Sequence, residues 1–201
     1  MDRSGWLKGL EVVNGSDYDP IVHRWSVRKR LTMLADSDVH RPILMDMDTA
    51  NGEHRPMTLV FATERTAGAI KDALFARRTA IYSQNLLIGD EMFLTPMFNQ
   101  SIQVKTPDVA IKGKGSAMVQ IHNTSSIPIE LLAQGSLKEV TLPPKLTLYA
   151  GKTVLLELRG KTNLSGTKEL VLPYRADNFK ITSRQALPVG IKVKVTFSPK
   201  A

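Results

Sequence analysis

The chain has 201 residues, of which 42% are hydrophobic and 23% charged, and it contains no cysteine. This composition is typical of a globular protein with a substantial core, and it excludes disulfides and thiolate metal sites. The net charge of +8 is uneven, because residues 1–100 carry 12 basic and 13 acidic side chains whereas residues 101–201 carry 15 and 6. We therefore expect two units with different surfaces.

Composition also limits the partners and the location of the protein. No apolar run is long enough to cross a membrane, and the first 15 residues lack the long apolar region of a secretory signal. The cytoplasm is the default expectation, and a periplasmic or secreted location stays open if a signal lies outside this chain. Because the lysines of the second half stand singly and no aromatic–basic motif accompanies them, we expect no nucleic-acid binding.

The first hundred residues alternate between strand and helix patterns. The stretch GLEVVNG predicts a buried strand over residues 9–15, and Asp19-Pro20 predicts a helix start with Asp at the N-cap and Pro at the first helical position. Residues 31–35 predict the next strand, which completes a βαβ unit of the kind that builds parallel sheets. The helix between them is expected to bury its apolar residues, Ile21, Val22, Trp25 and Val27.

Two further elements are predicted in this half. Residues 57–62, MTLVFA, predict a third strand after a polar loop. Thr63 and Glu64 are expected to cap and begin a second helix. Its apolar residues at helical spacing are Ala67, Ile70, Ala73 and Leu74.

The second hundred residues show strict alternation of apolar and polar side chains. In GIKVKVTF, Ile191, Val193, Val195 and Phe197 share one face, and the residues between them are polar. Five other strand candidates, separated by Pro, Gly, Asn and Ser, cover residues 101–105, 116–122, 127–133, 145–150 and 152–160. This pattern predicts an antiparallel β-sandwich. With a junction near residues 86–101, we divide the chain into residues 1–98 and residues 99–201.

Polar side chains with metal-binding chemistry follow the strands of the βαβ unit. Asp36, Asp38 and His40 come directly after the second strand, and Glu11 and Asn14 lie at the end of the first. Side chains two apart in an extended segment point to the same side, so Asp38 and His40 could ligate one cation together. Carboxylate plus imidazole suits zinc, manganese or iron. The alternative is a solvated polar turn in which Asp36 caps the following segment.

The other histidines do not complete a metal site by local spacing. Zinc usually takes three or four protein ligands. His23 falls inside the first helix beside Trp25, which favours packing or surface exposure. His54 precedes the third strand, at the end opposite to the predicted site if that strand is parallel, and His122 falls in the sandwich half. The missing ligands are therefore distant in sequence or outside this chain.

Three stretches, GLEVVNGSDYDPIVHRW, LTMLADSDVHRP and HRPMTLVFATERTAGAIKDALFARRTAIY, resemble the C-terminal part of bacterial PHP-type (polymerase and histidinol phosphatase) phosphoesterases. The branch that it resembles most, a group of phosphodiesterases, carries an added β-sandwich. The resemblance implies an α/β plus all-β fold: the last strands of a (β/α)7 barrel, followed by an antiparallel Ig-like sandwich. It implies that Asp38 and His40 are metal ligands. Cleft-lining positions would be Glu11, Asn14, Asp36 and Arg41, with Asp36 replacing the family's usual Asn.

The family's opening H-x-H motif is absent from this sequence. We therefore expect a C-terminal fragment of a metal-dependent phosphoesterase, inactive by itself, with weak or no binding of zinc, manganese or iron. The intact protein would hydrolyse a phosphate-ester substrate, and a second chain could complete the barrel. The alternative function is a non-catalytic interaction or binding protein in which the β-sandwich is the functional part.

Overall fold

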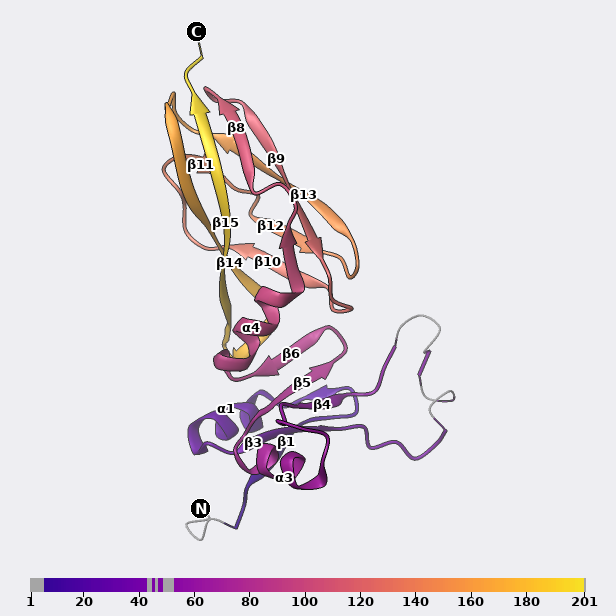
Figure 1. The fold of residues 1–201 in the computed structure, drawn as a ribbon. Helices are drawn as coiled ribbons and strands as arrows, with labels where there is room; N and C mark the ends of the chain where they lie inside the picture. Colours follow the sequence, from indigo (N-terminus) through magenta and orange to yellow (C-terminus); the bar gives the residue numbers. More distant parts are fainter. Residues whose placement is uncertain (1–5, 43–44, 46, 49–52, 201) are drawn as a thin grey trace. The chain divides into compact units, whose positions relative to one another are not determined.

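The computed structural model describes residues 6–42, 45, 47–48 and 53–200, and the chain divides into two compact units (Figure 1). The first unit comprises Met1–Leu94 and Phe179–Gln185, and the second comprises Thr95–Asn178 and Ala186–Ala201. The turn between the last two strands therefore belongs to the first unit, although most of both strands belongs to the second.

The first unit contains two helices, six strands and the start of a third helix among its described residues before position 95. In chain order these are β1 (Gly9–Asn14), β2 (Asp17–Tyr18), α1 (Pro20–Lys29), β3 (Thr32–Asp36), β4 (Met57–Val60), α3 (Ala67–Phe75), β5 (Thr79–Ser83), β6 (Leu86–Gly89) and α4 (Glu91–Ser101).

The predicted βαβ unit is confirmed. β1 and β3 pair in parallel, and α1 connects them. The carboxylate of Asp19 accepts hydrogen bonds from the backbone N–H groups of Ile21 and Val22 at 2.7 and 3.0 Å, as an N-cap should. Arg30 ends the helix in the left-handed conformation with φ 55°. The short strand β2, which pairs antiparallel with β1, was not predicted.

The predicted apolar face of α1 is wrong at three of its four positions. Ile21 and Trp25 are 52% and 53% exposed, and Val27 is exposed as well. The helix instead buries His23 and Ser26, while Val22 packs partly against the core. These residues form one stripe at i, i+3 and i+4 spacing, and that stripe faces the strands because α1 contacts β1 and β3.

The third strand is present but does not extend a parallel sheet. β4 ends at Val60 and pairs antiparallel with β5. The hydroxyl of Thr58 accepts a hydrogen bond from the N–H of Ala35 at 2.8 Å and donates one to the C=O of Ala35 at 3.1 Å. Thr79, the register partner of Val60, donates its hydroxyl to the C=O of Met33 at 3.0 Å. β4 therefore runs opposite to β3, and threonine side chains bond the edge of β3.

The helix after β4 begins later than predicted. Its N-cap is Thr66 rather than Thr63, and the Thr66 hydroxyl accepts a hydrogen bond from the N–H of Ala69 at 3.2 Å. Ala73 is fully buried as expected, whereas Ile70 is exposed.

The segment of residues 86–101, where the junction is expected, contains the division between Leu94 and Thr95 and is made of the ordered elements β6 and α4. β5 and β6 form a hairpin across Gln84-Asn85, and β6 pairs in parallel with Phe179 and Lys180 at the end of β14. Ile81 and Ile88 of this hairpin join one core cluster with four residues of β1 and β3: Val12, Val13, Met33 and Ala35. The hairpin thus supplies a second layer that the sequence did not predict. A (β/α)7 barrel is not evident in the described part of the chain.

The second unit is a β-sandwich. Its strands are β7 (Ile102–Val104), β8 (Asp108–Lys112), β9 (Ser116–Asn123), β10 (Ile129–Ala133), β11 (Val140–Thr141), β12 (Lys145–Leu148), β13 (Thr153–Gly160) and most of β14 (Gly166–Thr182) and β15 (Gln185–Ser198). One sheet has the order β11-β13-β9-β7, and the other continues from β12 through β10, β14 and β15 to β8.

Alternation along β15 is as predicted. The four apolar residues of its GIKVKVTF stretch, Ile191, Val193, Val195 and Phe197, are at most 3% exposed. The prediction of a purely antiparallel sandwich is wrong at one place, because β8 pairs in parallel with β15. β8, β11 and the 17-residue β14 were not predicted. In the described residues, no helix is long and apolar enough to cross a membrane.

Candidate functional site

The carboxyl ends of β1 and β3 place polar side chains together. Asn14, the last residue of β1, is the register partner of Asp36, the last residue of β3. Gly15 then turns the chain with φ 56°, and its N–H donates to the C=O of Asp36 at 2.9 Å. The parallel register therefore brings an amide and a carboxylate to one edge of the sheet.

The predicted ligand pair Asp38 and His40 lies just beyond this edge. Nε2 of His40 is 3.2 Å from Oδ1 of Asp38, so the two side chains are neighbours, although the segment is not extended as the i, i+2 argument assumed. Asp38 adopts φ 48°, a left-handed conformation that Asp tolerates better than most residues. Both side chains are open to solvent, with 83% of His40 and 59% of Asp38 exposed.

The remaining predicted residues do not join this pair. Glu11 accepts a hydrogen bond from Nδ2 of Asn14 at 3.0 Å, and Arg41 is exposed after His40. Among the residues that the structure describes, no three His, Asp or Glu side chains are grouped to hold a metal ion. Asp38 and His40 alone supply fewer ligands than a zinc site usually has.

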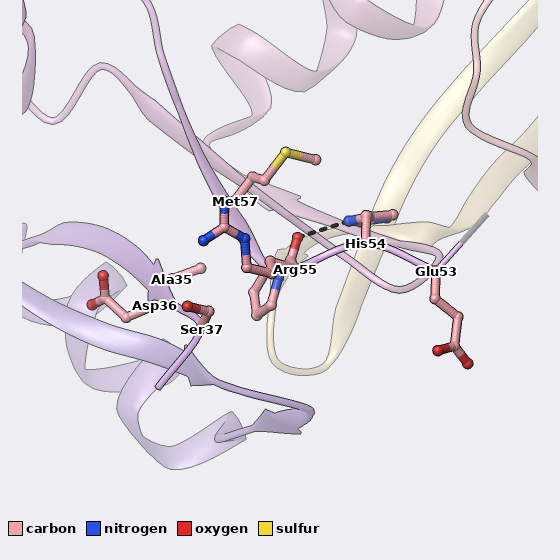
Figure 2. A pocket seen from close by; sticks show the side chains of 8 residues that line it. Ala35, Asp36, Ser37, Glu53, His54, Arg55 and Met57 are labelled. Carbon is pink, nitrogen blue, oxygen red and sulfur yellow. Dashed lines mark hydrogen bonds between the residues drawn. The ribbon is translucent and has the colours of Figure 1, made fainter. Parts of the chain in front are cut away.

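A pocket of about 420 Å³ adjoins the end of β3. Figure 2 shows Ala35, Asp36 and Ser37 on one side of it and the segment of residues 53–57 on the other. Asp36 is the one predicted site residue that lines this pocket. Sequence reasoning missed the opposite wall because it treated β4 as parallel.

His54 connects this pocket to a second one of about 600 Å³. Its ring stacks on Tyr82 with 4.2 Å between centroids. Nδ1 is 2.8 Å from the C=O of Arg55, and Nε2 is 3.2 Å from the C=O of Gln84. Both ring nitrogens of His54 therefore face backbone carbonyls. The second pocket is otherwise lined by Gly15, Ser16, Met47, Glu53, Pro56, Tyr82, Ser83, Gln84 and Asn85.

The reversed direction of β4 explains how His54 reaches the predicted site. A residue that precedes a parallel strand lies at the amino edge of the sheet, but a residue that precedes a reversed strand lies at the carboxyl edge of its neighbours. The sequence did carry a signal for the hairpin of β5 and β6, the apolar runs TAIYS and LLIG separated by two residues, but that signal does not fix the direction of β4.

His23 is a structural histidine outside both pockets. It is fully buried, and its Nδ1 lies 2.8 Å from the hydroxyl of Tyr18. Burial lowers the pKa of His23 to about 4, and burial together with the charge of Asp19 raises the pKa of Tyr18. The sequence-based expectation of packing or surface exposure is thus resolved in favour of packing.

Comparison with known proteins identifies the sandwich. Residues 102–192 match the sequence model of a family described as an Ig-like domain. None of the curated proteins matches the chain.

The chain is also similar to a two-domain protein from Bacteroides vulgatus ATCC 8482 that contains a predicted PHP-like metal-dependent phosphoesterase. The identity is 31% and the TM-score is 0.82, over 92% of this chain and 52% of that protein. The chain therefore spans about half the length of this relative, and the PHP part is not shown in it.

Weaker structural likeness is confined to about half of the chain. A C. elegans member of the MSP family is 15% identical with a TM-score of 0.37, over 49% of this chain and 98% of that one. The chaperone–tip adhesion subunit complex of Csu pili from Acinetobacter baumannii is 14% identical with a TM-score of 0.34, over 48% of this chain and 56% of that one. Scores this low give no basis for a functional inference.

Proposed function

We propose that this chain is a non-catalytic interaction protein in which the Ig-like sandwich is the functional part. The observation that carries the proposal is that residues 102–192 match an Ig-like domain. The polar edge of the first unit supports it, because the described residues there form no group of three metal ligands, and the predicted ligands Asp38 and His40 are both exposed. A hydrolytic metal centre needs a fixed set of ligands in a shielded cavity.

An activity assay tests this proposal. We expect the purified chain, supplied with manganese, to hydrolyse an aryl phosphodiester no faster than manganese alone. The informative variant is His40→Ala, and the matched control is His122→Ala, which removes a histidine from the sandwich. Hydrolysis by the wild type and His122→Ala, but not by His40→Ala, would overturn the non-catalytic role.

A second candidate is that the chain forms the C-terminal part of a PHP-type metal-dependent phosphoesterase. Support comes from the 31% identity to the Bacteroides vulgatus protein and from the contact between Asp38 and His40. In this role these two residues would hold zinc, manganese or iron, and the cleft would be lined by Glu11, Asn14, Asp36 and Arg41. The substrate would be a phosphate ester, and a second polypeptide could complete the barrel.

The described residues fit such a metal only in part, so no catalytic step is assigned to them. A complementation assay tests the candidate: the chain is mixed with the part of the Bacteroides vulgatus protein that the similarity does not cover. Manganese-dependent hydrolysis that needs both polypeptides and is lost in His40→Ala would favour this role. Hydrolysis that persists in His40→Ala would remove the chain from the reaction.

A further inference from the structure

Five exposed lysines gather at one end of the sandwich, and we call them the lysine cluster. They come from the β8–β9 turn, the β10–β11 loop, the segment after β13 and the segment after β15: Lys112, Lys114, Lys138, Lys161 and Lys200. Figure 1 shows the ends of β8 and β15 side by side at the end of the sandwich from which the C-terminal segment leaves.

Backbone hydrogen bonds hold these segments together. The N–H of Gly113 donates to the C=O of Ser198 at 2.8 Å, and the N–H of Gly160 donates to the C=O of Gly115 at 2.9 Å. The N–H of Lys161 donates to the C=O of Glu139 at 2.9 Å. Because regular strands and their turns fix these contacts, the gathering of the lysines is part of the fold.

Two of the joined segments approach so closely that only glycine fits. A Cβ at Gly160 would lie 2.5 Å from the C=O oxygen of Gly113, which is closer than such atoms can approach. The Lys200 N–H donates to Oδ1 of Asn163 at 2.8 Å, which ties the C-terminal segment to the segment after β13. The β8–β9 turn, the segment after β13 and the C-terminal segment therefore present their lysines from one compact surface.

None of the five lysines forms an ion pair with an acid in the described part of the sandwich. Glu139, the acid next to Lys138, forms an ion pair with Lys168 at 2.9 Å. That hydrogen bond, with further effects that include the charge of Lys138, lowers the pKa of the Glu139 carboxyl. The other ion pairs recorded in the described sandwich also use cations outside the cluster: Lys194–Asp108, Lys145–Glu130, Arg159–Glu157 and Arg175–Asp177.

The composition of the cluster indicates the class of partner. Its segments, residues 112–115, 134–139, 161–165 and 198–200, contain no arginine and no aromatic residue. Binding to single-stranded nucleic acid uses aromatic stacking, and sequence-specific binding to duplexes uses side chains that read base edges, most often arginine, and the cluster offers neither aromatic residues nor arginine. Lysines on an end surface need only a dense layer of negative charge, which an anionic lipid bilayer provides.

We propose that the lysine cluster docks the protein on an anionic membrane surface. The inference rests on the proposed interaction role and names its partner. Each lysine near such a surface strengthens binding about fivefold, so four of them account for a change in partitioning on the order of several hundred-fold. The attraction is electrostatic and falls as added salt shortens the range over which charges act.

Cosedimentation with vesicles of phosphatidylglycerol and phosphatidylcholine tests the proposal on the full chain. The variant replaces Lys112, Lys114, Lys138 and Lys200 with Gln. Lys161 is retained because its Nζ donates to the C=O of Leu137 at 2.7 Å. A control variant with the same loss of charge replaces four exposed lysines elsewhere with Gln, namely Lys8, Lys105, Lys152 and Lys192. Thermal unfolding of both variants confirms that each is folded.

We expect the wild type and the control variant to bind the mixed vesicles at low salt. Neither should bind vesicles of pure phosphatidylcholine. The cluster variant should lose on the order of several hundred-fold in partitioning. Equal loss in both variants would mean that net charge alone causes binding, and it would overturn the proposal. So would wild-type binding to a sulfated polysaccharide or duplex DNA through these lysines without binding to vesicles. If the wild type does not bind vesicles, the membrane proposal is wrong but the proposed non-catalytic role is unaffected. If the chain hydrolyses a phosphodiester and this depends on His40, the non-catalytic role is wrong, regardless of the result with vesicles.

Discussion

Substitution of Phe179 tests whether the tip of the β14–β15 hairpin is an integral part of the first unit. This residue is 1% exposed and pairs with Leu87 of β6, although more than ninety positions separate them in sequence. A buried Phe side chain removes about 200 Å² from water, which corresponds to about 5 kcal/mol at roughly 25 cal/mol per Å². Because Ala keeps part of that burial and leaves a cavity, we expect Phe179→Ala to lower the free energy of unfolding by about 3 to 4 kcal/mol.

The loss should fall on the first unit, since residues 179–185 cluster with residues 1–94. A domain is typically stable by only about 5 to 15 kcal/mol, so about 3 kcal/mol raises the open population of that unit by roughly two orders of magnitude. Limited proteolysis with mass spectrometry should therefore show faster cleavage in the first unit, with little change inside the sandwich. Urea unfolding of the wild type and Phe179→Ala measures the change in the free energy of unfolding.

A control on the same strand separates this effect from a general weakening of β14. Val171 is 54% exposed, and Val171→Ala should change the free energy of unfolding by at most about 0.5 kcal/mol. If Phe179→Ala speeds cleavage of the sandwich and leaves the first unit resistant, the hairpin tip is not part of the first unit's core and the reasoning is refuted.

Three further predictions concern the first unit. Burial lowers the pKa of His23 to about 4 from an unfolded value near 6.5. The free energy of unfolding should therefore fall by about 3 kcal/mol as the pH falls from 7 to 4. An equal fall of the free energy of unfolding over this pH range in His23→Gln would contradict this. Thr58→Val removes both bonds to Ala35 and should cost about 1 to 3 kcal/mol by urea unfolding, whereas Thr63→Val, at an exposed position, should cost little. Zinc calorimetry should show weak binding that the double variant Asp38→Asn, His40→Ala abolishes; equal uptake by both proteins would mean that the pair is only a polar turn.

Local signals in the sequence predicted local structure well. Asp19 and Pro20 fix the start of α1 by chemistry within one turn, and apolar runs mark β1 and β3 on either side. The prediction of which face of α1 is buried was wrong, because that face depends on how the helix lies on the sheet. Trp25 ranks as apolar, yet the stripe toward β1 and β3 passes through His23, whose nitrogen finds a partner in Tyr18.

Local sequence patterns could not predict the pairings between distant segments. The direction of β4 is fixed by its pairing with β5 and by threonine hydroxyls that bond the edge of β3. One strand of the second layer of the first unit, β6, pairs with Phe179, which a division of the chain at residue 98 assigns to the sandwich. Alternation predicted the inner face of β15, but it carries no information on the parallel partner β8.

The reversal of β4 also determines what the polar edge of the sheet can bind. It carries a histidine to the pocket that Asp36 lines, which at first favours a third metal ligand beside Asp38 and His40. However, a metal ligand must offer a free lone pair, and each ring nitrogen of His54 faces a backbone carbonyl, at 2.8 and 3.2 Å. The ring is further held by its stacking on Tyr82. His54 therefore lines the two pockets with both ring nitrogens facing backbone oxygens, and in the described part of the chain it does not form a group of three ligands with Asp38 and His40.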